Sequence, residues 1–145
     1  MKTKKTIGIL GGGQLGMFLC NSAKKQKVSV SIFSEVDNCS AKSFADKFYL
    51  GKFSKLNSLD NFINSVDLIT VETENIPLKV LHYIEKKKEL FPNSNVISVA
   101  QDRVKEKTFI NSLNKIKTTK FNPINTFEDL KISLNNFGGK ILIKS

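Results

Sequence analysis

The sequence predicts an α/β fold, a doubly wound parallel sheet over residues 1–99, followed by a segment of different character over residues 100–145. Short, continuous apolar runs alternate with stretches in which apolar residues recur at helical spacing, which is typical of a sheet that is buried on both faces. A cluster of glycines joins the first apolar run to the first helical stretch, as in many doubly wound sheets. Together these observations predict parallel strands connected by helices.

The strands are expected where apolar and β-branched residues gather in short runs between turns. They lie at residues 6–10, 28–33, 48–50, 67–71 and 96–99. A first helix is expected at residues 14–27, where apolar residues recur every three or four positions. Two more helices are expected to begin at Ser58, a suitable cap, and at Pro77, whose fixed φ suits a first helical position. The polar stretch 34–47 indicates a loop with one helical turn.

The segment after residue 99 has two further helices and two less regular stretches. Helices are expected at residues 102–114 and from residue 126 to the glycine pair 138–139, an irregular stretch or strand at 120–124, and a strand at 140–144. Thr126 opens a capping-box sequence, which supports the second of these helices. Because the last expected strand coincides with the end of the given sequence, we expect this segment to be truncated within a domain.

Composition and charge exclude several classes of protein. With 145 residues, 40% hydrophobic and 25% charged, the chain has the balance of a soluble globular domain. No apolar run approaches the ~20 residues of a membrane helix, and no signal-peptide core follows the basic start, so we expect a cytoplasmic protein without a membrane partner. Cys20 and Cys39 lack zinc-site spacing and are expected to be free thiols. The net charge is +10, but Arg103 is the only arginine among 23 basic residues, so we expect no nucleic-acid partner.

Residues 11–16, Gly-Gly-Gly-Gln-Leu-Gly, fit the G-x-G-x-x-G pattern between a strand and a helix. Glycines there permit positive φ angles and let a phosphate approach the backbone amides of the helix N-terminus. A dinucleotide site also uses an acidic residue after the second strand, and Glu35 stands close to that place. The motif fits a dinucleotide, a smaller phosphorylated ligand, or a tight turn that binds nothing.

Glu72 and Glu74 follow the fourth expected strand, at the edge where open α/β sheets bind ligands. Carboxylates two positions apart on a strand point the same way, although this strand is expected to end between them. The pair suits hydrogen bonds to ribose hydroxyls or an amine, and equally a solvated loop. Arg103 suits either a bidentate phosphate contact or an ion pair at a helix start. His82 has no partner at metal-ligand or catalytic-triad spacing, so we expect no chemical role for it.

Four segments, in order, resemble the N5-carboxyaminoimidazole ribonucleotide synthetase family, ATP-grasp ligases of purine biosynthesis. They are the glycine-rich residues 7–16, the acidic strand end at 67–77, residues 101–107 with Gln-Asp-Arg and a lysine, and residues 141–144, Ile-Leu-Ile-Lys. The resemblance spans nearly all of this chain but only the first portion of such an enzyme. It implies a Rossmann-like pre-ATP-grasp domain at residues 1–99 and the beginning of an ATP-grasp domain at 100–145.

The resemblance also implies residue roles and a reaction. Aminoimidazole ribonucleotide would be held in the first domain by Gly13, Gln14, Leu15, Glu72 and Glu74. Arg103 and Lys144 would contact the phosphates of ATP. ATP would activate bicarbonate as carboxyphosphate, which then carboxylates the exocyclic amine of the nucleotide. Mg²⁺ would neutralise phosphate charge, and its ligands are expected beyond residue 145. The full-length enzyme is expected to be a homodimer. The isolated 145-residue chain is expected to be inactive.

The sequence also departs from the family's pattern and fits parts of two other functions. Met17 and Phe18 stand where a basic residue is common, and residues 37–42 match a Ser-Pro-Ala segment only loosely, which leaves their phosphate contact unassigned. A non-catalytic NAD-binding Rossmann sensor would use the glycine motif and Glu35. A sibling ATP-grasp ligase acting on glycinamide ribonucleotide typically has Glu where this chain has Gln14.

Overall fold

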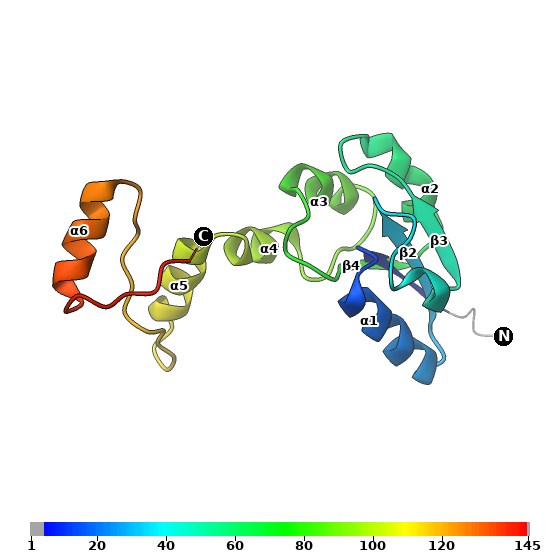
Figure 1. Cartoon of the computed structure of the whole chain (residues 1–145). Coiled ribbons are helices and arrows are strands. Elements are labelled where there is room, and N and C mark those ends of the chain that lie inside the picture. Colours follow the sequence, from blue (N-terminus) through cyan, green and yellow to red (C-terminus); the bar gives the residue numbers. More distant parts are fainter. Residues whose placement is uncertain (1–4, 145) are drawn as a thin grey trace. The chain divides into compact units, whose positions relative to one another are not determined.

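The computed structural model describes residues 5–144, and the contacts divide the chain into two compact units, Met1–Ser98 and Val99–Ser145 (Figure 1). The sheet lies entirely in the first unit. Each unit is described by itself below.

The first unit is built on a four-stranded parallel sheet with the strand order β3-β2-β1-β4. Its strands are β1 Thr6–Leu10, β2 Ser29–Ser34, β3 Lys47–Leu50 and β4 Leu68–Val71. β1 pairs with β2 on one side and with β4 on the other, so the chain leaves β1 in one direction along the sheet and later returns to its other side. The predicted doubly wound α/β fold is confirmed, with the four carboxyl ends at one edge.

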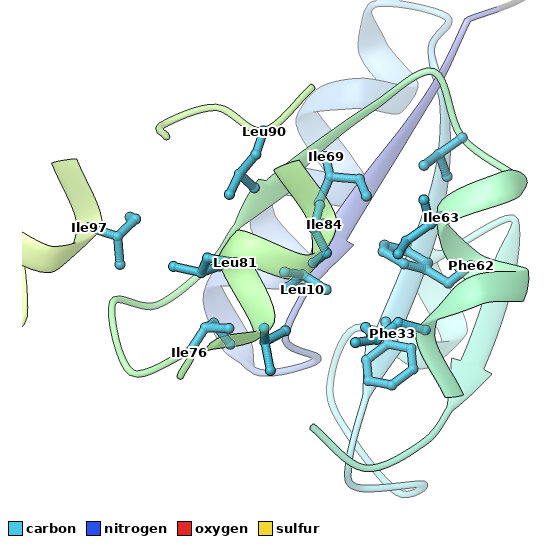
Figure 2. Packing of buried hydrophobic residues seen from close by; sticks show 13 residues of the cluster. Leu10, Phe33, Phe62, Ile63, Ile69, Ile76, Leu81, Ile84, Leu90 and Ile97 are labelled. Carbon is cyan, nitrogen blue, oxygen red and sulfur yellow. The ribbon is translucent and has the colours of Figure 1, made fainter. Parts of the chain in front are cut away.

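Helices and short 3₁₀ turns cover both faces of this sheet. They are α1 Gln14–Lys25, η1 Lys42–Phe44, η2 Leu56–Leu59, α2 Asp60–Asn64 and α3 Leu78–Glu85. α4 Ser94–Ala100 follows α3, and its Ile97 joins the buried cluster described next. Successive residues of β1 point to opposite faces. Ile9 is buried in a cluster with Cys20 of α1, whereas Leu10 is buried in a larger cluster with Phe62 of α2 and Leu81 of α3 (Figure 2). Because both faces are covered at the centre of the sheet, β1 (Thr-Ile-Gly-Ile-Leu) and β4 (Leu-Ile-Thr-Val) are nearly continuous apolar runs. β2 also contains serines, and the edge strand β3 begins with the exposed Lys47.

Two expected features of the first unit are wrong. Residues 96–99 belong to α4 and not to a fifth strand, because Asn93 Oδ1 accepts the Val96 N–H at 3.1 Å and caps a helix there. Ile97 is 4% exposed and Val96 53% exposed, the one-sided burial of a surface helix. Ser58 is not a helix cap either, since its hydroxyl donates to a backbone carbonyl at 2.7 Å and α2 begins two residues later.

The neighbour of β4 on its outer side is a single residue of the segment before α4. Leu90 forms an isolated parallel bridge with Ile69. The Ile69 N–H donates to the Glu89 carbonyl at 2.9 Å, and the Phe91 N–H donates to the Ile69 carbonyl at 2.9 Å. The segment before α4 is therefore bonded to the sheet at a single bridge, and the fifth strand expected at residues 96–99 does not form.

The second unit contains two helices whose starts the sequence predicted. α5 Arg103–Ser112 begins after Asp102, whose side chain accepts two backbone N–H groups of the first turn. α6 Phe127–Asn136 begins after Thr126, and the capping box with Asp129 is present. Both helix starts are therefore fixed by the residues that the sequence pattern singled out.

The expected strand at residues 140–144 is wrong, because this stretch is irregular. A strand needs a neighbour for its backbone hydrogen bonds, and no segment of residues 99–144 pairs with it. Leu142 is 81% exposed, so the apolar run has no buried face in this unit. Residues 120–124 are irregular as well, one of the two states expected for them.

Candidate functional site

The glycine loop, residues 11–16, and the acidic strand end meet at the carboxyl edge of the sheet. The loop follows β1 and Glu72 follows β4, and Leu10 pairs with Val71, so the two strands end side by side. From β1 the chain adds β2 and β3 on one side and then adds β4 on the other side of β1. The carboxyl ends of β1 and β4 therefore flank a topological switch point. The glycine loop and Glu72 thus meet where open α/β sheets bind ligands.

Glu72 binds the glycine loop directly. Its Oε1 accepts the Gly13 N–H at 2.7 Å, and its Oε2 accepts the Gly16 N–H. These groups belong to the first turn of α1, which has no side-chain cap of its own and no acidic residue in that turn. The Glu72 carboxylate therefore satisfies two donors that a helix start leaves open, and its charge interacts favourably with the helix dipole.

The close approach of Glu72 explains the glycines of the motif. A Cβ on Gly11 would lie 2.4 Å from the Glu72 Cγ, and Gly11 also has a φ of +105°. A Cβ on Gly13 would lie 2.9 Å from Oε1, and one on Gly16 would lie 2.8 Å from Oε2. Each of the three glycines of the G-x-G-x-x-G pattern thus makes room for this one side chain.

The other expected nucleotide contacts lie on the surface around this loop. Gln14 and Leu15 form the exposed start of α1, with Leu15 60% exposed. β4 ends at Val71, so Glu72 and Glu74 both lie in the loop after it. Glu72 is partly buried against the glycine loop and Glu74 is exposed. The two carboxylates therefore do not act as a matched pair.

A cleft of about 670 Å³ opens beside the glycine loop at the same edge. Its walls come from residues that follow the strands: Gly11, Ser34, Glu35, Phe53, Ser54, Thr73, Asn75, Ile76, Pro77, Lys79 and Val80. The sequence-based prediction missed most of them, although the rule that ligands bind beyond the carboxyl ends of strands would have found them. Glu35, the ribose partner of the NAD hypothesis, accepts the Phe53 N–H at 2.8 Å and is engaged in holding the loop after β3.

The second unit has a cleft of its own, of about 510 Å³, between α5, α6 and the irregular stretches. It brings together the two residues expected to contact ATP, Arg103 and Lys144. Three more lysines line the same cleft, Lys107, Lys120 and Lys140. Arg103 also forms the ion pair expected at a helix start, with its Nη1 2.7 Å from Glu106 Oε2.

The histidine and the two cysteines are the remaining candidates for chemistry in the described part of the chain. Within residues 5–144 no group of three or more His, Cys, Asp or Glu could hold a metal ion, and His82 is exposed on α3. Cys20 and Cys39 are free thiols, and burial raises the pKa of the Cys20 thiol to about 11. In the same range, every helix is too short or too polar to cross a bilayer.

Comparison with known proteins gives consistent results. The family model of the ribonucleotide synthetase preATP-grasp domain matches residues 4–101. The N5-carboxyaminoimidazole ribonucleotide synthetase of Thermus thermophilus superposes with a TM-score of 0.80 at 33% identity, over 90% of this chain and 36% of that one. The ADP complex of N5-carboxyaminoimidazole synthetase from Staphylococcus aureus gives 0.81 at 29% identity, over 92% and 36%.

A curated relative is similar over the same extent. The bifunctional purine synthesis protein purC/E of Dictyostelium discoideum is 36% identical over 97% of this chain, which corresponds to 14% of that protein. The chain thus spans little more than a third of either solved structure and a smaller part of this relative. Since the family model covers more than half of the sequence and the parallel sheet with its glycine loop agrees with it, the chain belongs to the ribonucleotide synthetase preATP-grasp domain family.

Proposed function

We propose that the chain forms the nucleotide-binding part of an ATP-grasp ligase that carboxylates 5-aminoimidazole ribonucleotide with bicarbonate. The observation that carries the proposal is the cleft of about 670 Å³ beside the glycine loop, in a fold shared with proteins named N5-carboxyaminoimidazole ribonucleotide synthetase. Such a volume lies within the range of small-molecule sites. The same similarities favour this function over an NAD-binding sensor and over a ligase for glycinamide ribonucleotide.

The nucleotide is proposed to lie along the carboxyl edge of the sheet, in and beside this cleft. Its proposed contacts are Gly13, Gln14, Leu15, Glu72 and Glu74. Glu72 contributes by fixing the loop, because both of its oxygens already accept backbone N–H groups. Lys79 is the cationic residue of the cleft wall and suits the phosphate of a mononucleotide, and Ser34 and Asn75 add polar groups.

ATP is proposed to bind through Arg103 and Lys144, with the three other lysines of the second cleft adding positive charge. In the proposed reaction a bicarbonate oxygen attacks the γ-phosphorus of ATP, ADP leaves, and carboxyphosphate forms. The exocyclic amine of the nucleotide then attacks the carboxyl carbon, inorganic phosphate leaves, and the nitrogen loses a proton. In this proposal the residues named above bind and orient the substrates.

Calorimetric titration of the 145-residue chain with aminoimidazole ribonucleotide, and separately with NAD, tests this proposal. We expect saturable binding of the nucleotide, no binding of NAD, and no bicarbonate-dependent ATPase activity. Lys79→Ala should weaken nucleotide binding about tenfold by removing a charge-assisted contact. Lys86→Ala, at the end of the same helix and outside the cleft wall, is the matched control and should bind normally. Binding of NAD without binding of the nucleotide would instead support the sensor function.

A further inference from the structure

Glu72 occupies the backbone groups that a phosphate uses in a dinucleotide-binding turn. In such a turn the amides at the helix N-terminus face the phosphates of the ligand. Here two of these amides, those of Gly13 and Gly16, donate to the two carboxylate oxygens of Glu72. The anion at the N-terminus of α1 therefore belongs to the protein itself.

The glycines show how closely the loop is fitted to this carboxylate. In a dinucleotide site the second glycine of the motif lets the backbone approach the pyrophosphate. In this chain a Cβ at any of the three motif positions would come closer than 3.0 Å to an atom of Glu72, so the space they leave is filled from within. The loop is shaped around a carboxylate on the neighbouring strand end.

We propose that Glu72 determines the specificity of this edge: it is an internal anion that fixes the glycine loop and excludes phosphates, and with them dinucleotides, from the N-terminus of α1. Both amides already have an acceptor, and the carboxylate repels a second anion. A nucleotide that binds at this edge must then place its phosphate elsewhere, for instance beside Lys79. The inference needs only the contacts of the loop, so it stands or falls independently of the reaction proposed above.

Anion binding to a Glu72→Ala variant tests the inference. The probes are acetate, which replaces the lost carboxylate, and inorganic phosphate, and the readouts are the amide NMR resonances of Gly13 and Gly16 and the thermal midpoint. In the unmodified chain we expect neither resonance to move saturably with either anion. In Glu72→Ala both should move saturably, and acetate should raise the midpoint of the variant alone. Glu89→Ala makes the same charge change at an exposed residue outside the glycine loop and the cleft wall, and should behave like the unmodified chain.

Glu72→Gln keeps the size of the side chain and decides the matter if the alanine variant does not fold. Its carboxamide oxygen can accept one N–H, but its NH₂ group cannot accept the other. Hydrogen exchange should therefore become roughly 10- to 100-fold faster at one of the two amides, Gly13 or Gly16, and stay slow at the other. Three results would overturn the proposal: saturable phosphate shifts at these amides in the unmodified chain, no anion site in a folded Glu72→Ala, or unchanged protection of both amides in Glu72→Gln.

Discussion

Replacing Gly11 by alanine should destabilise the first unit chiefly through its effect on Glu72. The residue has a φ of +105°, and holding an L-residue at positive φ costs about 1–2 kcal/mol. The new methyl carbon would also lie 2.4 Å from the Glu72 Cγ, so the side chain must move away. Losing one of its two charge-assisted hydrogen bonds costs about 1.5–3 kcal/mol more, and the total expected loss is about 2.5–5 kcal/mol.

A double-mutant cycle with Glu72→Ala separates these two contributions. The free energies of unfolding of the four proteins would be measured by urea denaturation followed by circular dichroism. In the Glu72→Ala background the collision is absent, so Gly11→Ala should cost only the backbone strain of about 1–2 kcal/mol. If Gly11→Ala costs the same in both backgrounds, the close packing of Glu72 on the loop does not constrain this position and the argument is wrong.

Three further outcomes are expected. Hydrogen bonds from Lys87 and Tyr83 hold the pKa of Asp60 below its usual value. The stability that these bonds add to the folded state is therefore complete above about pH 4 and is lost as the pH falls further. In urea denaturation at a series of pH values, Asp60→Asn should lack this part of the loss of stability in acid. Phe62→Ala should lower the free energy of unfolding by about 3–5 kcal/mol, because the ring is fully buried, and a loss below 1 kcal/mol in urea denaturation would contradict the packing shown in Figure 2. Ellman's reagent near pH 8 should modify the half-buried Cys39 rapidly and Cys20 slowly, because the Cys20 thiol is buried and its pKa is raised to about 11. Cys39→Ser should abolish the rapid phase, and rapid modification of two thiols per chain would contradict the prediction.

The strands of the sheet were predictable because each contains a short run of apolar and β-branched residues between turns, most continuous in the central strand β1. Residues 96–99 show the limit of that rule. Val-Ile-Ser-Val has the composition of a strand, but a helix capped by Asn93 can bury Ile97 alone and leave Val96 in solvent. Composition over four residues does not separate these states, and the cap and the tertiary contact decide between them.

The candidate site was predictable in its location and less so in its details. The strand-loop-helix context of the glycines and the acidic end of the fourth strand were enough to bring Glu72 to the loop. Which of Glu72 and Glu74 turns inward depends on the register that pairs Leu10 with Val71, and a sequence pattern does not contain that register. The cleft walls depend on how the loops after β2, β3 and β4 lie against one another, which local propensity does not determine.

The single bridge at Leu90 has a consequence for how this sheet meets other molecules. An edge strand with free backbone groups is a template on which another chain can add a strand. β4 is only four residues long, and both backbone groups of Ile69 are already taken, the N–H by the Glu89 carbonyl and the carbonyl by the Phe91 N–H. The short segment 89–91 of the same chain thus occupies the middle of this edge, and it hinders edge-to-edge association along β4 without a full fifth strand.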